Sequence, residues 1–155
     1  MGKLGVSIYP ERSTFEKDQA YLDLAHKYGF KRVFTSLLQI TDDKEKVFAE
    51  FKKVVDYANS LEMEVMVDIN PSLFEQLEIS YDDLSFFHEM GAYGVRLDIG
   101  FTGVEEARMT RNPYNIKIEI NMSGGTKYVD NIMSYSPNTE NLLGSHNFIH
   151  IAIQD

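Results

Sequence analysis

The chain has 155 residues, with 15 Lys and Arg against 24 Asp and Glu, and a formal net charge of −9. This acidic balance argues against nucleic acid as the main partner, since phosphate backbones require a basic face. The sequence contains no cysteine, which excludes a disulfide framework and a thiolate metal site. It shows neither a signal peptide nor a run of ~18 apolar residues, so we expect a soluble cytoplasmic protein without a membrane partner.

Short apolar segments alternate with longer amphipathic ones along the chain. Strands are expected at 4–9, 32–37, 64–69, 93–98, 115–121 and from 142 onward. Helices are expected at 13–29, 42–61, 80–91, 104–109 and 126–135. The unit repeats after roughly 30 residues, as expected of strand–helix units that carry parallel strands.

Two architectures fit this alternation: an open doubly wound sheet and a closed barrel. The turn after the first strand has neither of the glycine-rich patterns that bind nucleotides, which removes the usual support for the open sheet. Polar residues instead end nearly every strand, as they do at the mouth of a barrel enzyme. We therefore predict an α/β fold of the TIM-type (β/α)8 class. Since a full barrel takes about 250 residues, we expect an incomplete one, with five βα units and a sixth strand.

Several segments, taken in order, resemble one known family. They include LGVSIYPE at 4–11, RVFTSLL at 32–38, SYDDLSFF at 80–87, GVRLD at 94–98, KIEIN at 117–121 and GSHNF at 144–148. Together they resemble the MupG-type 6-phospho-N-acetylmuramidase family over residues 2–148. The resemblance implies a complete barrel followed by a smaller β-rich C-terminal domain. Residues 1–148 are then the N-terminal part of the barrel. The resemblance also implies cleavage of 6-phospho-N-acetylmuramyl-N-acetylglucosamine in cell-wall recycling, so a phosphorylated amino-sugar disaccharide is the expected partner.

The sequence departs from the family pattern after Phe148. In one permitted back-translation of residues 147–155, a single T added after the Phe148 codon restores Asn-Phe-Tyr-Pro-His-Arg-Tyr-Thr-Gly, which is the pattern that the resemblance implies. We therefore expect residues 149–155 to be a frameshifted tail, and we expect the 155-residue chain itself to be inactive.

Glycoside hydrolysis uses two carboxyl groups, one as acid and one as nucleophile or base. Asp98 and Glu119 end neighbouring strands, and we predict that they form this pair, with the two roles left unassigned. Arg96 precedes Asp98 by two residues and shares its face of the strand, where it either neutralises carboxylates or binds an anionic substrate group.

The other polar residues at strand ends are candidates for substrate binding. They are Glu11, Ser36, Asp68, Asn121, His146 and Asn147. No spacing of His, Asp and Glu indicates a metal, and no cofactor is expected.

Two other functions remain open at this point. A sugar-phosphate lyase or isomerase would use one carboxylate as a base. A non-catalytic half-barrel would associate with itself through the exposed edges of its first and sixth strands.

Overall fold

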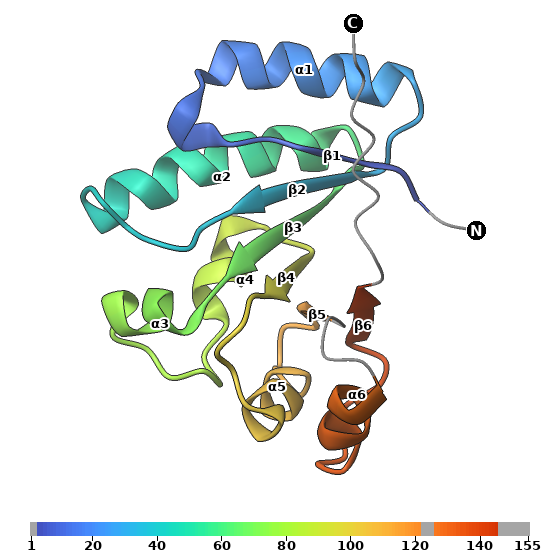
Figure 1. Ribbon diagram of the computed structural model, residues 1–155. Coiled ribbons are helices and arrows are strands. Elements are labelled where there is room, and N and C mark those ends of the chain that lie inside the picture. Colours follow the sequence, from blue (N-terminus) through green and yellow to red (C-terminus); the bar gives the residue numbers. More distant parts are fainter. Residues whose placement is uncertain (1–2, 122–125, 146–155) are drawn as a thin grey trace, which may run out of the picture.

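A computed structural model describes residues 3–121 and 126–145 of the chain (Figure 1). His146, Asn147 and the expected frameshifted tail lie outside the described residues. The elements follow one another as β1 Gly5–Ser7, η1 Pro10–Arg12, α1 Phe15–Lys27, β2 Arg32–Ser36, α2 Lys44–Ser60, β3 Glu64–Ile69, α3 Pro71–Leu77, α4 Ser85–Met90, β4 Gly94–Leu97, α5 Gly103–Met109, β5 Lys117–Asn121, α6 Thr126–Met133 and β6 Leu142–Ser145.

The six strands form one sheet in which every pairing is parallel and the order is β1-β2-β3-β4-β5-β6. An order that follows the chain without reversal is that of a barrel wall, whereas a doubly wound sheet reverses direction in its middle. Figure 1 shows the helices following one another around one side of this sheet. The structure thus confirms the α/β fold of an incomplete TIM-type barrel.

The two faces of the sheet differ in chemistry. The face toward the helices is aliphatic, and Val33, Val67 and Ile118 on it are fully buried. Phe51 of α2 and Phe87 of α4 are fully buried in the same core. Because burying a side chain of this size stabilises by about 1.5–3 kcal/mol, this layer holds the helices to the sheet. The opposite face carries Phe34 and Met66, with polar side chains toward both ends of the strands.

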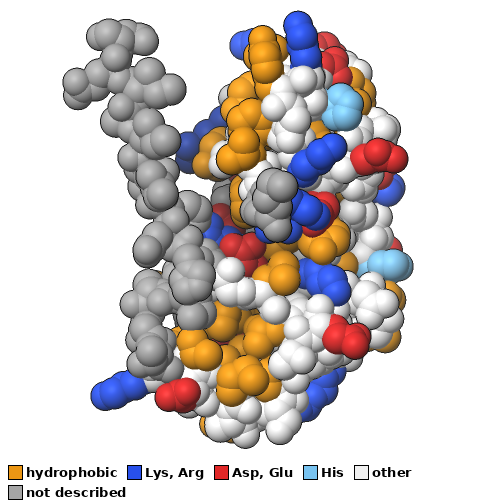
Figure 2. Space-filling model, turned by 90° about the vertical axis from the view of Figure 1, so that its right-hand side faces the viewer, with side chains coloured by type: hydrophobic (Ala, Val, Ile, Leu, Met, Phe, Trp, Pro, Cys, Tyr) orange, Lys and Arg blue, Asp and Glu red, His pale blue; other side chains and the backbone are white. Residues whose placement is uncertain are grey.

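The face opposite the helices begins with an ion-paired cluster at the start of the strands. Glu64 of β3 accepts hydrogen bonds from Lys3 and from Arg32 of β2, the latter over 3.1 Å. Figure 2 views the molecule from the side on which β2 and β3 begin, and acidic and basic side chains lie there next to hydrophobic ones. These ion pairs provide partners for the charged side chains on the face of the sheet opposite the aliphatic core.

One helix was not predicted. The structure forms α3 directly after β3, where Asn70 caps the helix by accepting from the Leu73 backbone N–H over 3.1 Å. Pro71 stands at the first helical position, where its missing N–H costs nothing. The helix expected from residue 80 begins only at Ser85, because Asp83 accepts hydrogen bonds from the Ser85 backbone and hydroxyl.

In the part of the chain that the structure describes, no helix is both long enough and apolar enough to cross a membrane.

Gly94 provides a test of the sheet. A Cβ atom at this position would lie 2.6 Å from the backbone oxygen of Lys117 and 2.9 Å from the Met66 side chain. We expect Gly94→Ala to lower the free energy of unfolding by about 1–3 kcal/mol, because a strand backbone cannot move aside as a side chain can. Urea unfolding measures this. Ser7→Ala, at an exposed position of β1, should change stability by less than about 0.5 kcal/mol, and an equal effect of both variants would contradict the prediction.

Candidate active site

Four polar side chains lie at one level of the sheet, near the carboxyl ends of neighbouring strands. The pairing registers align Ser36 with Asp68, Asp68 with Arg96, and Arg96 with Glu119. We call these four residues the polar row. In parallel strands a common register places side chains on the same face, so the row lines the inner side of the barrel wall.

Arg96 lies between the two carboxylates of the polar row. Its Nε atom is 3.9 Å from Oδ1 of Asp68 and 3.9 Å from Oε1 of Glu119. Arg96 is 9% exposed and Glu119 is 7% exposed. Charges that are this well removed from water need partners, and the guanidinium offers donors to both neighbours at once.

Asp68 is fixed from both sides. Its Oδ2 atom accepts a hydrogen bond from the Ser36 hydroxyl over 3.3 Å, while Oδ1 faces Arg96. Burial raises the pKa of Asp68 above its ordinary value, against the lowering effects of Arg96 and Ser36. The negative charges of Asp98 and Glu119 add to the rise. Asp68 is therefore a carboxyl group that holds its proton more tightly than it would in water.

One carboxylate oxygen of Glu119 accepts no hydrogen bond from the described residues. Its Oε2 atom is buried and finds no hydrogen-bond partner among residues 3–121 and 126–145. A buried carboxylate oxygen without a partner carries a desolvation cost, which a donor on a bound molecule would offset. The polar row thus ends in an atom suited to meet a ligand.

Asp98 lies just beyond β4 and is exposed. Its backbone N–H donates to Ile69 over 2.9 Å, and its Oδ1 accepts from the Ile99 backbone over 2.9 Å. It is close enough to raise the pKa of Asp68 by its charge. Asp98 therefore borders the polar row from the solvent side, and its pairing with Glu119 in catalysis stays a prediction.

The remaining candidates fall outside the polar row. Glu11 lies in η1 and is exposed. Asn121 ends β5, and its side chain is outside the described part of the structure. Glu11 lines a cleft that Ser36 also lines, so it borders the polar row without belonging to it.

A second buried carboxyl group was not foreseen. Glu106 of α5 is fully buried and accepts a hydrogen bond from the Tyr128 hydroxyl of α6. Burial raises the pKa of Glu106, and the Tyr128 hydrogen bond opposes the rise. No sequence signal marks it, since a Glu within an amphipathic helix is normally solvated. Among the described residues, no group of three His, Cys, Asp or Glu side chains is arranged to hold a metal ion.

The fold and the polar row define a barrel-type α/β protein with paired carboxylates at the carboxyl ends of its strands. Residues 4–149 match the family described as 6-phospho-N-acetylmuramidase, N-terminal, and the chain belongs to this family.

Solved structures share the fold. An uncharacterized B. cereus protein is 48% identical, with a TM-score of 0.78 over 94% of this chain and 38% of that one. A conserved Enterococcus faecalis protein of unknown function is 22% identical, with a TM-score of 0.74 over 92% of this chain and 38% of that one. The structure of CpGH84B is 11% identical, with a TM-score of 0.52 over 77% of this chain and 27% of that one. The chain thus spans 38% of the length of the first two proteins. No curated protein matches it.

The effects of Arg96 and Ser36 on the pKa of Asp68 can be ranked and tested. Arg96 lowers the Asp68 pKa more than Ser36 does. We therefore expect Arg96→Gln to raise this pKa further than Ser36→Ala, as measured by NMR titration of the Asp68 carboxyl carbon. Ser60→Ala, at an exposed position on α2, should leave it unchanged. A larger rise in Ser36→Ala than in Arg96→Gln would contradict the ranking.

The raised pKa of Asp68 also predicts how the stability of the fold changes with pH. Because the folded chain holds the Asp68 proton more tightly than the unfolded chain does, this group stabilises the fold fully only below its ordinary pKa of 3.8. The contribution is lost as the pH rises through the folded-state pKa. Asp68→Asn should therefore gain stability relative to the unaltered chain as the pH rises through this window.

Proposed function

We propose that this chain carries the catalytic face of a cytoplasmic glycoside hydrolase that cleaves 6-phospho-N-acetylmuramyl-N-acetylglucosamine in cell-wall recycling. One observation carries the proposal: the polar row places Asp68 and Glu119 on either side of Arg96 at the mouth of a barrel wall. Membership of the phosphomuramidase family supports the choice of bond and of sugar. Because the chain spans 38% of its B. cereus relative, we assign the activity to a longer polypeptide.

The charge of the polar row suits this reaction. Glu119, in the role of nucleophile or base, supplies a negative charge at one end of the row. The transition state of glycoside cleavage resembles an oxocarbenium ion, which is positive at the reacting carbon. A carboxylate that is held in place away from water stabilises this positive charge, because its surroundings need not reorganise as the charge develops.

Glu119 is proposed as one of the two catalytic carboxyl groups. For the other, the sequence favours Asp98, and the structure offers Asp68 beside it. A raised pKa suits a general acid, since the acid must be protonated before the bond breaks. We therefore propose Glu119 as nucleophile or base, and we leave Asp98 and Asp68 to be separated by experiment.

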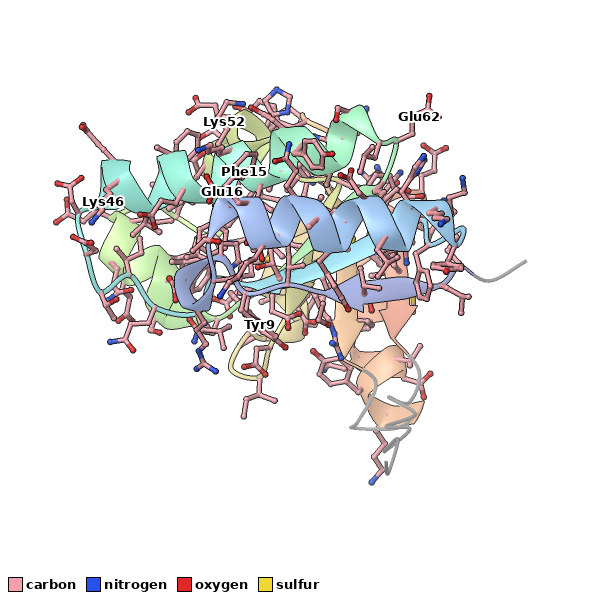
Figure 3. All side chains as sticks on the ribbon, turned by 90° about the horizontal axis from the view of Figure 1, so that it is seen from above. Tyr9, Phe15, Glu16, Lys46, Lys52 and Glu62 are labelled. Carbon is pink, nitrogen blue, oxygen red and sulfur yellow. The ribbon has the colours of Figure 1, made fainter. Side chains whose placement is uncertain are left out.

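The test uses a chimera in which residues 1–148 replace the matching segment of the B. cereus relative. Glu119→Gln should lower kcat by about 10²–10⁴-fold on the phosphorylated disaccharide, with the sugars released measured by mass spectrometry. The control is Glu62→Gln. Glu62 follows the C-terminal end of α2, opposite the end that carries Lys46 (Figure 3), and it is exposed. Full activity of Glu119→Gln, or elimination products in place of hydrolysed sugars, would refute the proposal. The 155-residue chain alone should be inactive.

A nitrophenyl glycoside of the same phosphosugar separates Asp98 from Asp68. Its phenolate leaves without protonation, so the variant that lacks the acid should keep most of its activity on this substrate and lose it on the disaccharide. We expect one of Asp98→Asn and Asp68→Asn to behave in this way. Equal losses on both substrates in both variants would contradict a general-acid role for either residue.

A second candidate function is assembly. In the described sheet, β1 pairs only with β2 and β6 only with β5, so each presents an unpaired edge. Exposed strand edges are templates for pairing with another chain. We propose that the isolated 155-residue chain self-associates through these edges. Light scattering over a concentration series should show a rising mass, and a constant monomer mass would reject the proposal.

A further inference from the structure

A cleft lies beside the polar row, between the segments that follow β1 and β2. Its volume is about 350 Å³. Tyr9 and Arg12 line it from the first segment, Gln39 and Thr41 line it from the second, and Phe51 of α2 also contributes to its wall. The cleft is thus built from two loops at the carboxyl ends of strands, where barrel enzymes bind their substrates.

The cleft and the polar row share one residue. Ser36 lines the cleft, and its hydroxyl donates to Oδ2 of Asp68. Asp68 is in turn next to Arg96, which faces Glu119. A molecule seated in the cleft therefore lies against the first member of the row, and its other end can extend along the row toward Glu119.

Two charged residues line the cleft, Glu11 and Arg12. Arg12 is exposed, and no ion pair involves it within residues 3–121 and 126–145. Glu11 also borders a neighbouring cleft, which Lys53, Asp18 and Glu50 line as well. A guanidinium at a concave surface binds a phosphate through paired, charge-assisted hydrogen bonds.

The other walls suit a sugar ring. Tyr9 is 51% exposed, and Figure 3 shows it on the side of β1 away from α1. Its ring offers an apolar face, while the Gln39 amide and the Thr41 hydroxyl supply donors and acceptors. Apolar surface together with a few polar groups is the usual composition of a small-molecule site.

We propose that Arg12 binds the phosphate of a phosphorylated amino sugar in this cleft, and thereby directs the glycosidic bond toward the polar row. This inference rests on the proposed function, and it adds the residue that selects the phosphorylated substrate. In a chain with a net charge of −9, a dianionic phosphate is repelled over most of the surface, so a local cation is needed to bind it.

The experiment compares two probes that differ only in the phosphate: N-acetylmuramic acid 6-phosphate and N-acetylmuramic acid. Both are titrated calorimetrically into the 155-residue chain. We expect the unaltered chain to prefer the phosphorylated sugar by at least about tenfold, as a charge-assisted hydrogen bond would provide. Arg12→Gln should abolish this preference. Arg108→Gln is the matched control, since Arg108 is exposed on α5, and it should keep the preference. Thermal melting checks that each variant is folded.

Three results would overturn the assignment. The first is equal affinity of the unaltered chain for both sugars, and the second is a preference that persists in Arg12→Gln. The third is an equal loss of affinity for both sugars in Arg12→Gln, which would place Arg12 on the lactyl carboxylate. These results are independent of the hydrolysis assay. A lost preference in Arg12→Gln with no hydrolysis by the chimera would leave the phosphate site standing without the proposed reaction, and the converse would leave the reaction without this site.

Discussion

Two carboxylates on either side of one strand repel each other across the sheet unless a cation lies between them. Arg96 is that cation, with its Nε atom 3.9 Å from Asp68 and 3.9 Å from Glu119. The arrangement requires β3, β4 and β5 to pair in one register, since a shift by one residue would turn each of these side chains to the other face. The charge balance of the site therefore depends on the same backbone pairing that forms the barrel wall.

The division between the two faces of the sheet explains how such a site is tolerated. The helix-facing side chains, Val33, Val67 and Ile118 among them, are fully buried and supply the hydrophobic stabilisation. The opposite face is thus free to carry groups that cost energy, including an oxygen of Glu119 without a partner in the described residues. Stability and chemistry are placed on alternate residues of the same strands.

The fold was predictable because alternating strand and helix patterns follow from local sequence periodicity. The strands at 5–7, 32–36, 64–69 and 94–97 all lie within the expected segments. Helix α3 was missed because no element was expected between residues 69 and 80, although Asn70 and Pro71 provide the capping residue and the first residue of a helix. Of the site, side-chain alternation along a strand predicted that Arg96 faces carboxylates, and the structure brings it beside Asp68 and Glu119. Asp98, which was expected to pair with Glu119, lies beyond the end of β4. The Arg12 cleft escaped notice, because a cavity between two loops depends on loop conformations that carry no periodicity.

The order of the polar row along the chain has a consequence for how the protein is made. Synthesis proceeds from the N-terminus, so Asp68 leaves the ribosome before Arg96, and Arg96 before Glu119. A nascent chain that ends after β3 would have to desolvate Asp68 without its cation, which disfavours docking of that strand. Once β4 emerges, the positive charge of Arg96 offsets the negative charge of Asp68. Arg96 is then already in place when β5 brings Glu119 beside it. The fourth strand is therefore the point at which Asp68 first meets the cation of the polar row on a neighbouring strand.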